Sequence, residues 1–192
     1  MASSDDDERV QPETVEEWRA WLDANHEVSP GVWLVSWKKH TGRPTVGYEA
    51  AVTEALAVGW VDSKGRRLDD DRTMLWLTPR RTTSGWSRPN KQRIERLVAE
   101  DRMGPAGQAA IDAAKDNGTW SLLDDVENLV VPDDLGTEFD RHPGARAAWE
   151  EFPRSVKRSI LEWIVTAKRP ETRRARIAET AEKAGRGERA HQ

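Results

Sequence analysis

The stretch VWLVSW, residues 32–37, is made almost entirely of β-branched and aromatic residues and predicts a strand. Successive side chains of a strand point to opposite faces, so Trp33, Val35 and Trp37 share one face. Large side chains at a period of two mark the buried face of a sheet. We therefore favour core packing over a ligand-binding wall for these two tryptophans.

Further strands are expected after this stretch. Short strand candidates occur at residues 60–62, 66–68 and 74–77, separated by turn-forming residues at 63–65 and 69–71. Such closely spaced segments are typical of neighbouring antiparallel strands. The sequence thus predicts a small antiparallel sheet of three to four strands.

Helical periodicity surrounds this sheet. Thr14 and Glu17 form a capping box at the head of one helix, Gly59 follows another, and Ser87 precedes a long helical region. The acidic stretch 121–136 appears irregular. The predicted helices cover 14–26 and 48–58, begin after Ser87 and at Pro105, and lie near 143–152, 154–168 and 170–184. The expected fold class is α+β, with the sheet packed against helices and followed by a C-terminal helical array.

Domain boundaries follow from the same periodicity. Residues 1–13 are acidic and polar, which predicts a disordered tail, and residues 188–192 are expected to fray. Between them, residues 14–187 are expected to form one domain, with an α+β part at 14–86 and a helical part at 87–187.

Composition limits the functional classes. The 192 residues contain no cysteine, which excludes disulfides and thiolate chemistry, and the four histidines lack metal-ligand spacing. We expect no metal and no cofactor. No apolar run approaches the ~20 residues of a transmembrane helix, and the acidic first residues are unlike a secretory signal. A cytoplasmic location is the expectation.

Charge is strongly segregated along the chain, although the net charge is only −4. Residues 72–96 and residues 154–192 each carry a net charge of +6, whereas residues 1–17 carry −6. Weak surface ion pairs between such blocks are one interpretation. The other is that the two basic blocks form an anion-binding face.

Three different local sequence patterns follow one another along the chain. The first has GVWL at 31–34, WKK at 37–39, YEAA at 48–51 and GWVDS at 59–63. The second has TPRR at 78–81, SGWS at 84–87, RIERL at 93–97 and PAG at 105–107, and the third has ILEWI at 160–164 and AKRPETR at 167–173. In order and spacing they resemble the YdeI/OmpD-associated, or bacteriocin-protection, family over roughly residues 14–187.

This resemblance implies a role rather than a reaction. Proteins of that family are associated with bacterial tolerance of bacteriocins and cationic antimicrobial peptides, and some members with an outer-membrane porin partner. The resemblance carries no firm reaction or cofactor. It therefore implies a bacterial stress-response protein that is non-enzymatic.

The loop at residues 80–90 is the first candidate site. A flexible loop that meets a helix start offers free N–H groups to an anion, and arginine side chains add bidentate donors for phosphate or carboxylate. Trp86 can either stack on a ligand ring or anchor the loop to the core, and core anchoring is favoured. The predicted ligand-binding residues are Lys38, Lys39, Trp60, Asp62, Arg80, Arg81, Trp86, Arg88, Asn90 and Arg93.

Three functional hypotheses remain open on these residues. The leading one is a binding protein for an anionic small molecule or protein partner. The second is nucleic-acid binding, which the basic blocks and interleaved tryptophans suggest. The third is an enzyme for a small anionic substrate with Asp62 as general base, although a turn-capping role is commoner for such an aspartate. Glu171, Glu179 and Glu182 interleave with the C-terminal bases, which favours a solvated helix face there.

Overall fold

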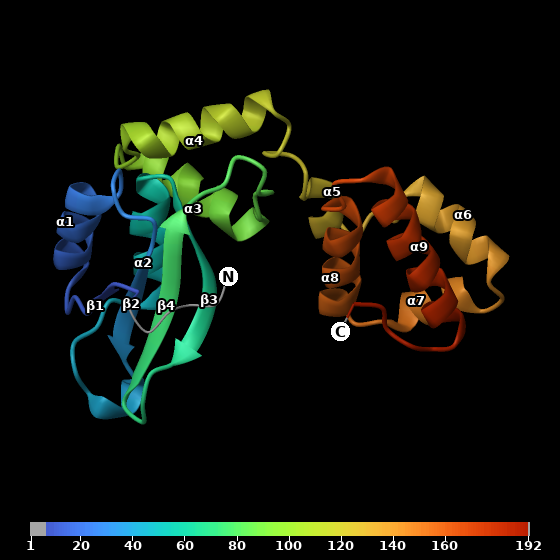
Figure 1. Ribbon diagram of the computed structural model, residues 1–192, viewed down its shortest axis with the longest axis horizontal. Coiled ribbons are helices and arrows are strands. Elements are labelled where there is room, and N and C mark those ends of the chain that lie inside the picture. Colours follow the sequence, from blue (N-terminus) through green and yellow to red (C-terminus); the bar gives the residue numbers. More distant parts are fainter. Residues whose placement is uncertain (1–6, 192) are drawn as a thin grey trace. The chain divides into compact units, whose positions relative to one another are not determined.

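The computed structural model describes residues 7–191 and confirms the α+β class (Figure 1). The chain forms two compact units. The first comprises the residues up to Ser84 together with Pro89–Trp120, and the second comprises Gly85–Arg88 together with the residues from Ser121 onward. The single domain expected over residues 14–187 stays a prediction.

The first unit contains a four-stranded sheet of order β1-β2-β4-β3. The β2–β4 and β4–β3 pairs are antiparallel, as expected, whereas β1 pairs with β2 in parallel, so the sheet is mixed. The strands are β1 (Arg9–Val10), β2 (Val32–Trp37), β3 (Trp60–Arg67) and β4 (Arg72–Pro79), and the helices are α1 (Val15–Asn25), α2 (Tyr48–Ala57), α3 (Arg88–Ala99) and α4 (Pro105–Asp116), with a 3-10 turn η1 (Lys39–Thr41).

Two predictions about the strands were wrong. Arg9 and Val10 lie in the expected disordered tail but form β1, because Val10 packs on the core and the Trp33 amide donates to the Glu8 carbonyl oxygen at 2.9 Å. Residues 63–65, expected as a turn, continue β3 through a register shift between Asp62 and Lys64. The rest of the predicted tail, residues 1–6, lies outside the described residues.

One face of the sheet is covered by α1 and α2. Trp18 and Leu22 of α1 pack with Ala51 and Ala55 of α2 against the sheet residues Val32, Leu34, Trp60 and Leu77. The Trp18 indole also donates to the Ala51 carbonyl oxygen at 3.0 Å, which ties the two helices together. The capping box is present, since the Thr14 hydroxyl accepts from the Glu17 amide at 3.2 Å. This face is the main core of the first unit.

The second unit is a helical array, as the sequence predicted for this part of the chain. Its core is formed by apolar side chains such as Phe139, Trp149, Ile160 and Ile164. The irregular stretch expected at 121–136 contains helical residues instead, because Leu135 and Phe139 supply a buried i,i+4 pair. The helices are α5 (Asp124–Glu127), α6 (Asp133–Arg141), α7 (Ala145–Glu151), α8 (Arg154–Val165) and α9 (Pro170–Gly185).

Residues 188–191 differ from the frayed tail that the sequence suggested. Ala190 is buried in the core of the second unit, and the His191 ring stacks on Trp163 with centroids 4.9 Å apart. Gln192 lies outside the described residues. Within residues 7–191, no helix combines the length and apolar character needed to cross a bilayer.

A close backbone approach between α2 and α4 generates a stability prediction. A Cβ built on Gly107 would lie closer to the Ala57 carbonyl oxygen than real Cβ atoms lie to any neighbour, and it would also press on the Met103 sulfur. We expect Gly107→Ala to lower the free energy of unfolding by about 1–3 kcal/mol through overpacking. Urea unfolding followed by tryptophan fluorescence measures this change.

The matched control is Gly47→Ala in the same unit, where a Cβ meets nothing within 4 Å. Gly47 is the N-cap of α2 and has an ordinary negative φ. We expect its substitution to cost less than about 1 kcal/mol, because no contact is strained and only the N-cap preference for glycine over alanine is lost. Equal losses for both variants would contradict a specific helix–helix contact at Gly107.

Candidate functional site

A polar cluster gathers four of the predicted site residues at the start of α2. The Tyr48 hydroxyl donates to Asp62 Oδ2 at 3.0 Å, which links the first residue of α2 to β3. Burial, followed by the hydrogen bond to Asp62, raises the pKa of Tyr48 above its usual value. Tyr48 therefore stays protonated at neutral pH and acts as a hydrogen-bond donor.

Arg80 lies beside this pair, directly after β4. Its amide donates to the Gly59 carbonyl oxygen at 3.0 Å, and its Nη2 donates to the Ser84 carbonyl oxygen at 3.4 Å. Burial lowers the pKa of Arg80 to about 10, and the negative charge of Asp62 opposes that change. The guanidinium is still a cation at neutral pH, so Arg80 places a half-buried positive charge near Asp62.

Arg93 and Asn90 of α3 complete the cluster. The Arg93 guanidinium grips Glu49 with contacts between 2.6 and 3.2 Å, donates to Asn90 Oδ1 at 2.7 Å and lies 5.8 Å from the Tyr48 ring centroid. Arg96 donates to the same Glu49 carboxylate at 2.6 Å. These hydrogen bonds lower the pKa of Glu49 to about 2. The cluster thus holds its own counter-charges and ties α2 to α3.

A groove of about 450 Å³ begins at Tyr48 and runs over the part of the sheet next to the start of α2. Leu34 and Leu75 give it an apolar floor, and the hydroxyls of Ser36 and Thr73 lie among them. Arg67, at its rim, is held by Asp70 and by the Asp69 carbonyl oxygen. The groove is large enough for a small molecule.

The remaining predicted residues of the first unit lie apart from this cluster. Lys38 donates to the carbonyl oxygens of Asp69 and Asp70 at 2.9 and 2.8 Å and so fixes the β3–β4 turn. Trp60 is 1% exposed, and its indole donates to the His26 carbonyl oxygen at 3.1 Å. Lys39 and Arg81 are exposed.

Trp86 and Arg88 lie in the segment Gly85–Arg88, which belongs to the second unit, although Arg88 is also the first residue of α3. Trp86 is only 1% exposed, as its anchoring role predicts, so its ring faces are closed to a ligand. Arg88 donates to Asn128 Oδ1 at 2.6 Å. The ten predicted residues are thus divided between two units, and that they form a single surface stays a prediction.

The second face of the sheet carries a constellation that sequence reasoning missed. Across the strands, Trp33 pairs with Trp76 and Trp76 with Lys64, while Val35 pairs with Met74 and Met74 with Arg66. The rings of Trp33 and Trp76 lie 5.2 Å apart. We call this surface the cationic Trp face and define it by Trp33, Trp37, Trp76, Arg43, Lys64, Arg66 and Arg72.

Cations cover the rings of this face. The Lys64 ammonium lies 5.4 Å from the Trp33 centroid and the Arg66 guanidinium 5.7 Å from it. Arg43 and Arg72 lie 4.4 and 5.4 Å from the Trp37 centroid. Each is a cation–π contact, which draws the positive charge against the π-face of the ring.

The uncompensated charges of this face distinguish it from the Tyr48 cluster. Arg72 is paired with Asp69 at 2.7 Å. Among the described residues, however, Lys64 and Arg43 make no ion pair with a carboxylate, and both are exposed. The alternation of Lys64 and Arg66 is the sequence signal for a strand that places both cations on one face, opposite Trp76 and Met74. The turn-forming residues at 63–65 hide this signal.

Metal ligation has no support in the described part of the chain. Within residues 7–191, no three or more His, Asp or Glu side chains are grouped so as to hold a metal ion. What the two polar surfaces offer is therefore hydrogen bonding and charge.

Comparison with protein families gives two matches on different parts of the chain. Residues 10–110, more than half of the chain, match a family described as Domain of unknown function (DUF8412). The chain belongs to this family. Residues 128–187 match the family described as Bacteriocin-protection, YdeI or OmpD-Associated. Neither the curated proteins nor the solved structures provide a significant match.

The second match confirms the suspected family and narrows its extent. The bacteriocin-protection, YdeI or OmpD-associated region covers the third sequence pattern and the helices α6 to α9. The first two patterns, with the sheet, the Tyr48 cluster and the cationic Trp face, fall within residues 10–110, the range of the domain of unknown function. A bacteriocin-protection-like protein is thus supported by its C-terminal part.

The Glu49 ion pairs generate a prediction about pH. A carboxylate whose pKa is lowered in the folded state stabilises the fold above its unfolded pKa near 4.5, and that stabilisation is lost as the pH falls towards 2. We expect Glu49→Gln to cost about 1 kcal/mol at pH 7, a modest value because Glu49 and Arg96 are each 57% exposed, although Arg93 is buried. Urea unfolding at several pH values measures the difference between wild type and variant.

That difference should shrink below pH 4.5 and vanish only below pH 2, where wild-type Glu49 is itself mostly protonated. Glu95→Gln on the exposed part of α3 is the control, because no ion pair of Glu95 occurs among residues 7–191. A Glu49→Gln penalty that is independent of pH would contradict the electrostatic origin.

Proposed function

We propose that the chain is a non-enzymatic binding protein of the bacteriocin-protection kind, active in the cytoplasm in stress tolerance, and that it holds an acidic segment of a partner protein on its cationic Trp face. The observation that carries this proposal is the exposed Lys64 ammonium, held over Trp33 and Trp76 without a carboxylate partner among the described residues. Lys39 and Arg81 stay in the proposed ligand-binding set because both are exposed.

Preorganisation supports an anion on this surface. A free lysine or arginine side chain loses rotamer entropy when it binds a carboxylate. Lys64, Arg66 and Arg43 are already placed against indole rings, so less of that entropy is left to lose. Several cations on one face also attract an acidic partner from a distance.

Burial of the Trp33 ring favours an acidic protein segment over nucleic acid, while Trp37 and Trp76 are only partly buried. Bases bind single-strand surfaces by stacking on exposed aromatic rings. Trp33 is 1% exposed beneath Lys64 and Arg66, and Trp60 and Trp86 are equally buried. The face therefore presents its positive charges outward and its most buried ring inward. Nucleic-acid binding remains the alternative that the experiment must separate.

Fluorescence anisotropy of a labelled poly-glutamate peptide, titrated with the protein at low and moderate salt, tests the proposal. We expect Lys64→Glu/Arg66→Glu to raise the Kd at least about tenfold, which corresponds to ~1.4 kcal/mol. Circular dichroism should show that the fold persists, since both side chains are exposed. A labelled single-stranded oligonucleotide, titrated in parallel, is expected to bind more weakly than the peptide.

The matched control is Lys168→Glu/Arg169→Glu, which makes the same change of charge in the second unit, where no ion pair of either residue is found in the described part of the chain. Equal weakening by both double variants would show that only net charge matters and would contradict a site on the sheet. Tighter oligonucleotide binding that depends on Lys64 and Arg66 would replace the acidic partner by nucleic acid.

A further inference from the structure

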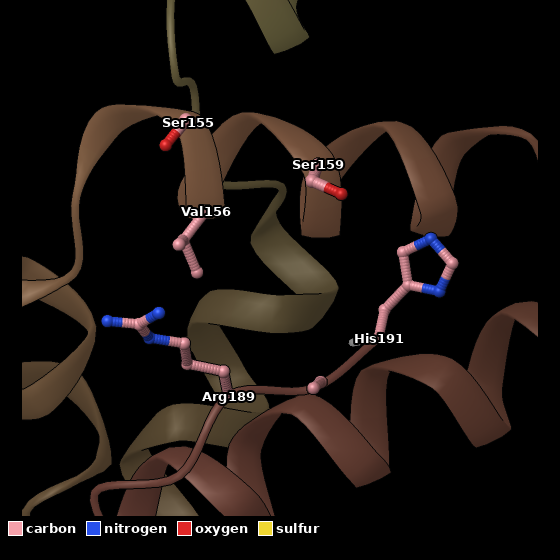
Figure 2. Close-up of a pocket in the computed structure, with 6 residues that line it drawn as sticks. Ser155, Val156, Ser159, Arg189 and His191 are labelled. Atoms are coloured by element: carbon pink, nitrogen blue, oxygen red, sulfur yellow. The ribbon is translucent and has the colours of Figure 1, made fainter. Parts of the chain in front are cut away.

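A separate groove of about 290 Å³ lies in the second unit, lined by residues of α8 and of the segment that follows α9. Ser155, Val156 and Ser159 line it from α8, and Arg189, Ala190 and His191 line it from the following segment (Figure 2). In this view Ser155, Val156 and the Arg189 guanidinium lie on one side, with Val156 between Ser155 and Arg189, and Ser159 and His191 lie on the other side. The groove thus has polar side chains on both sides, with Val156 and Ala190 as its apolar lining.

The donors of this groove are uncommitted within the described residues. No hydrogen bond or ion pair of the Ser155 or Ser159 hydroxyls or of the Arg189 guanidinium occurs there, and no acidic residue lines the groove. By contrast, two basic residues nearby in the sequence form ion pairs: Arg186 pairs with Glu182 at 2.6 Å, and Lys183 pairs with Glu179 at 2.8 Å. A guanidinium with two hydroxyls and no nearby carboxylate is suited to an oxyanion.

Packing holds the segment in position. The Glu188 amide donates to the Lys183 carbonyl oxygen at 2.9 Å, and Ala190 is buried in the core. His191 stacks on Trp163 in a nearly parallel arrangement, with an interplanar angle of 4°. Arg189 therefore projects from a backbone that is fixed on both sides, which limits the positions that its side chain can take.

We infer that this groove is a binding site for a small oxyanion-bearing molecule, a carboxylate or a phosphate. Arg189 binds the oxyanion, Val156 contacts the carbon skeleton, and the side chains of Ser155, Ser159 and His191 offer further hydrogen-bonding groups. The volume of about 290 Å³ lies close to the lower end of the range for small-molecule sites, which suits a small ligand. This site is in the second unit and is independent of the proposed acidic-partner surface.

Two-dimensional ¹H–¹⁵N NMR tests the inference with sodium phosphate and, separately, sodium acetate, at fixed pH and ionic strength. We expect saturable shifts of the Ser155, Ser159 and Arg189 amides and of the Trp163 indole with at least one anion. Arg189→Ala should weaken that binding at least tenfold, and Ser155→Ala should weaken it less. Tighter phosphate binding assigns a phosphate ligand, and tighter acetate binding assigns a carboxylate.

Arg174→Ala is the control, since Arg174 is exposed on α9 and makes no ion pair within the described residues. It should leave the titration unchanged. Shifts that fail to saturate with both anions, or that persist unchanged in Arg189→Ala, would overturn the inference. Because all the altered side chains are exposed, loss of folding does not confuse the result.

Discussion

The constraint on which the first unit depends is that its sheet has two apolar faces, of which α1 and α2 cover one. Strand β2 places Val32 and Leu34 on the face that packs with α1 and α2, and Trp33 and Val35 on the opposite face. The apolar cluster on that opposite face consists of strand residues, with Leu68 from the turn after β3. Apolar side chains so placed must still be screened from water.

Cationic side chains provide that screening at Trp33. Lys64 and Arg66 lie over its ring, and the ring is left 1% exposed. Long cationic side chains cover apolar surface with their methylene stems while the charged ends remain in water. Structural cover and surface charge therefore have the same origin, and the tryptophan positions the cations instead of contacting the ligand itself.

The two polar surfaces of the first unit differ in how their charge is balanced. In the Tyr48 cluster, Glu49 forms ion pairs with both Arg93 and Arg96, and the result is a tie between α2 and α3. On the cationic Trp face, Lys64 and Arg43 have no such partner among the described residues. Arginine content alone does not distinguish a structural ion-pair network from a surface that is free to bind an anion. The positions of the acidic residues make that distinction.

Much of the fold followed from local sequence, and its exceptions have clear physical causes. The capping box at Thr14 and the alternation at 32–37 act within a few residues, so the helix and strand were predictable. The β1 strand has only Arg9 and Val10, and pairing with β2 rather than any local pattern creates it. Residues 63–65 resemble a turn, yet the register shift lets them continue β3 beside β4.

The site was less predictable than the fold. Asp62, Arg80, Asn90 and Arg93 do come together, because α2, β3 and α3 meet there. Sequence alone could not show that Glu49 forms an ion pair with Arg93, since 44 residues separate them. It also could not show which tryptophans are buried, because ring exposure depends on the cations that the strand register places opposite them.

The most direct test of this account is an NMR measurement of the Lys64 side-chain protons. If Lys64 lies over Trp33 and Trp76, the ring currents should shift its terminal methylene resonances upfield, and Trp33→Leu should remove most of that shift while Lys168, in the second unit, stays unaffected. Lys64 resonances at ordinary lysine positions, unchanged by Trp33→Leu, would contradict the account, because the cations would then be neither cover for the sheet nor preorganised for an anion.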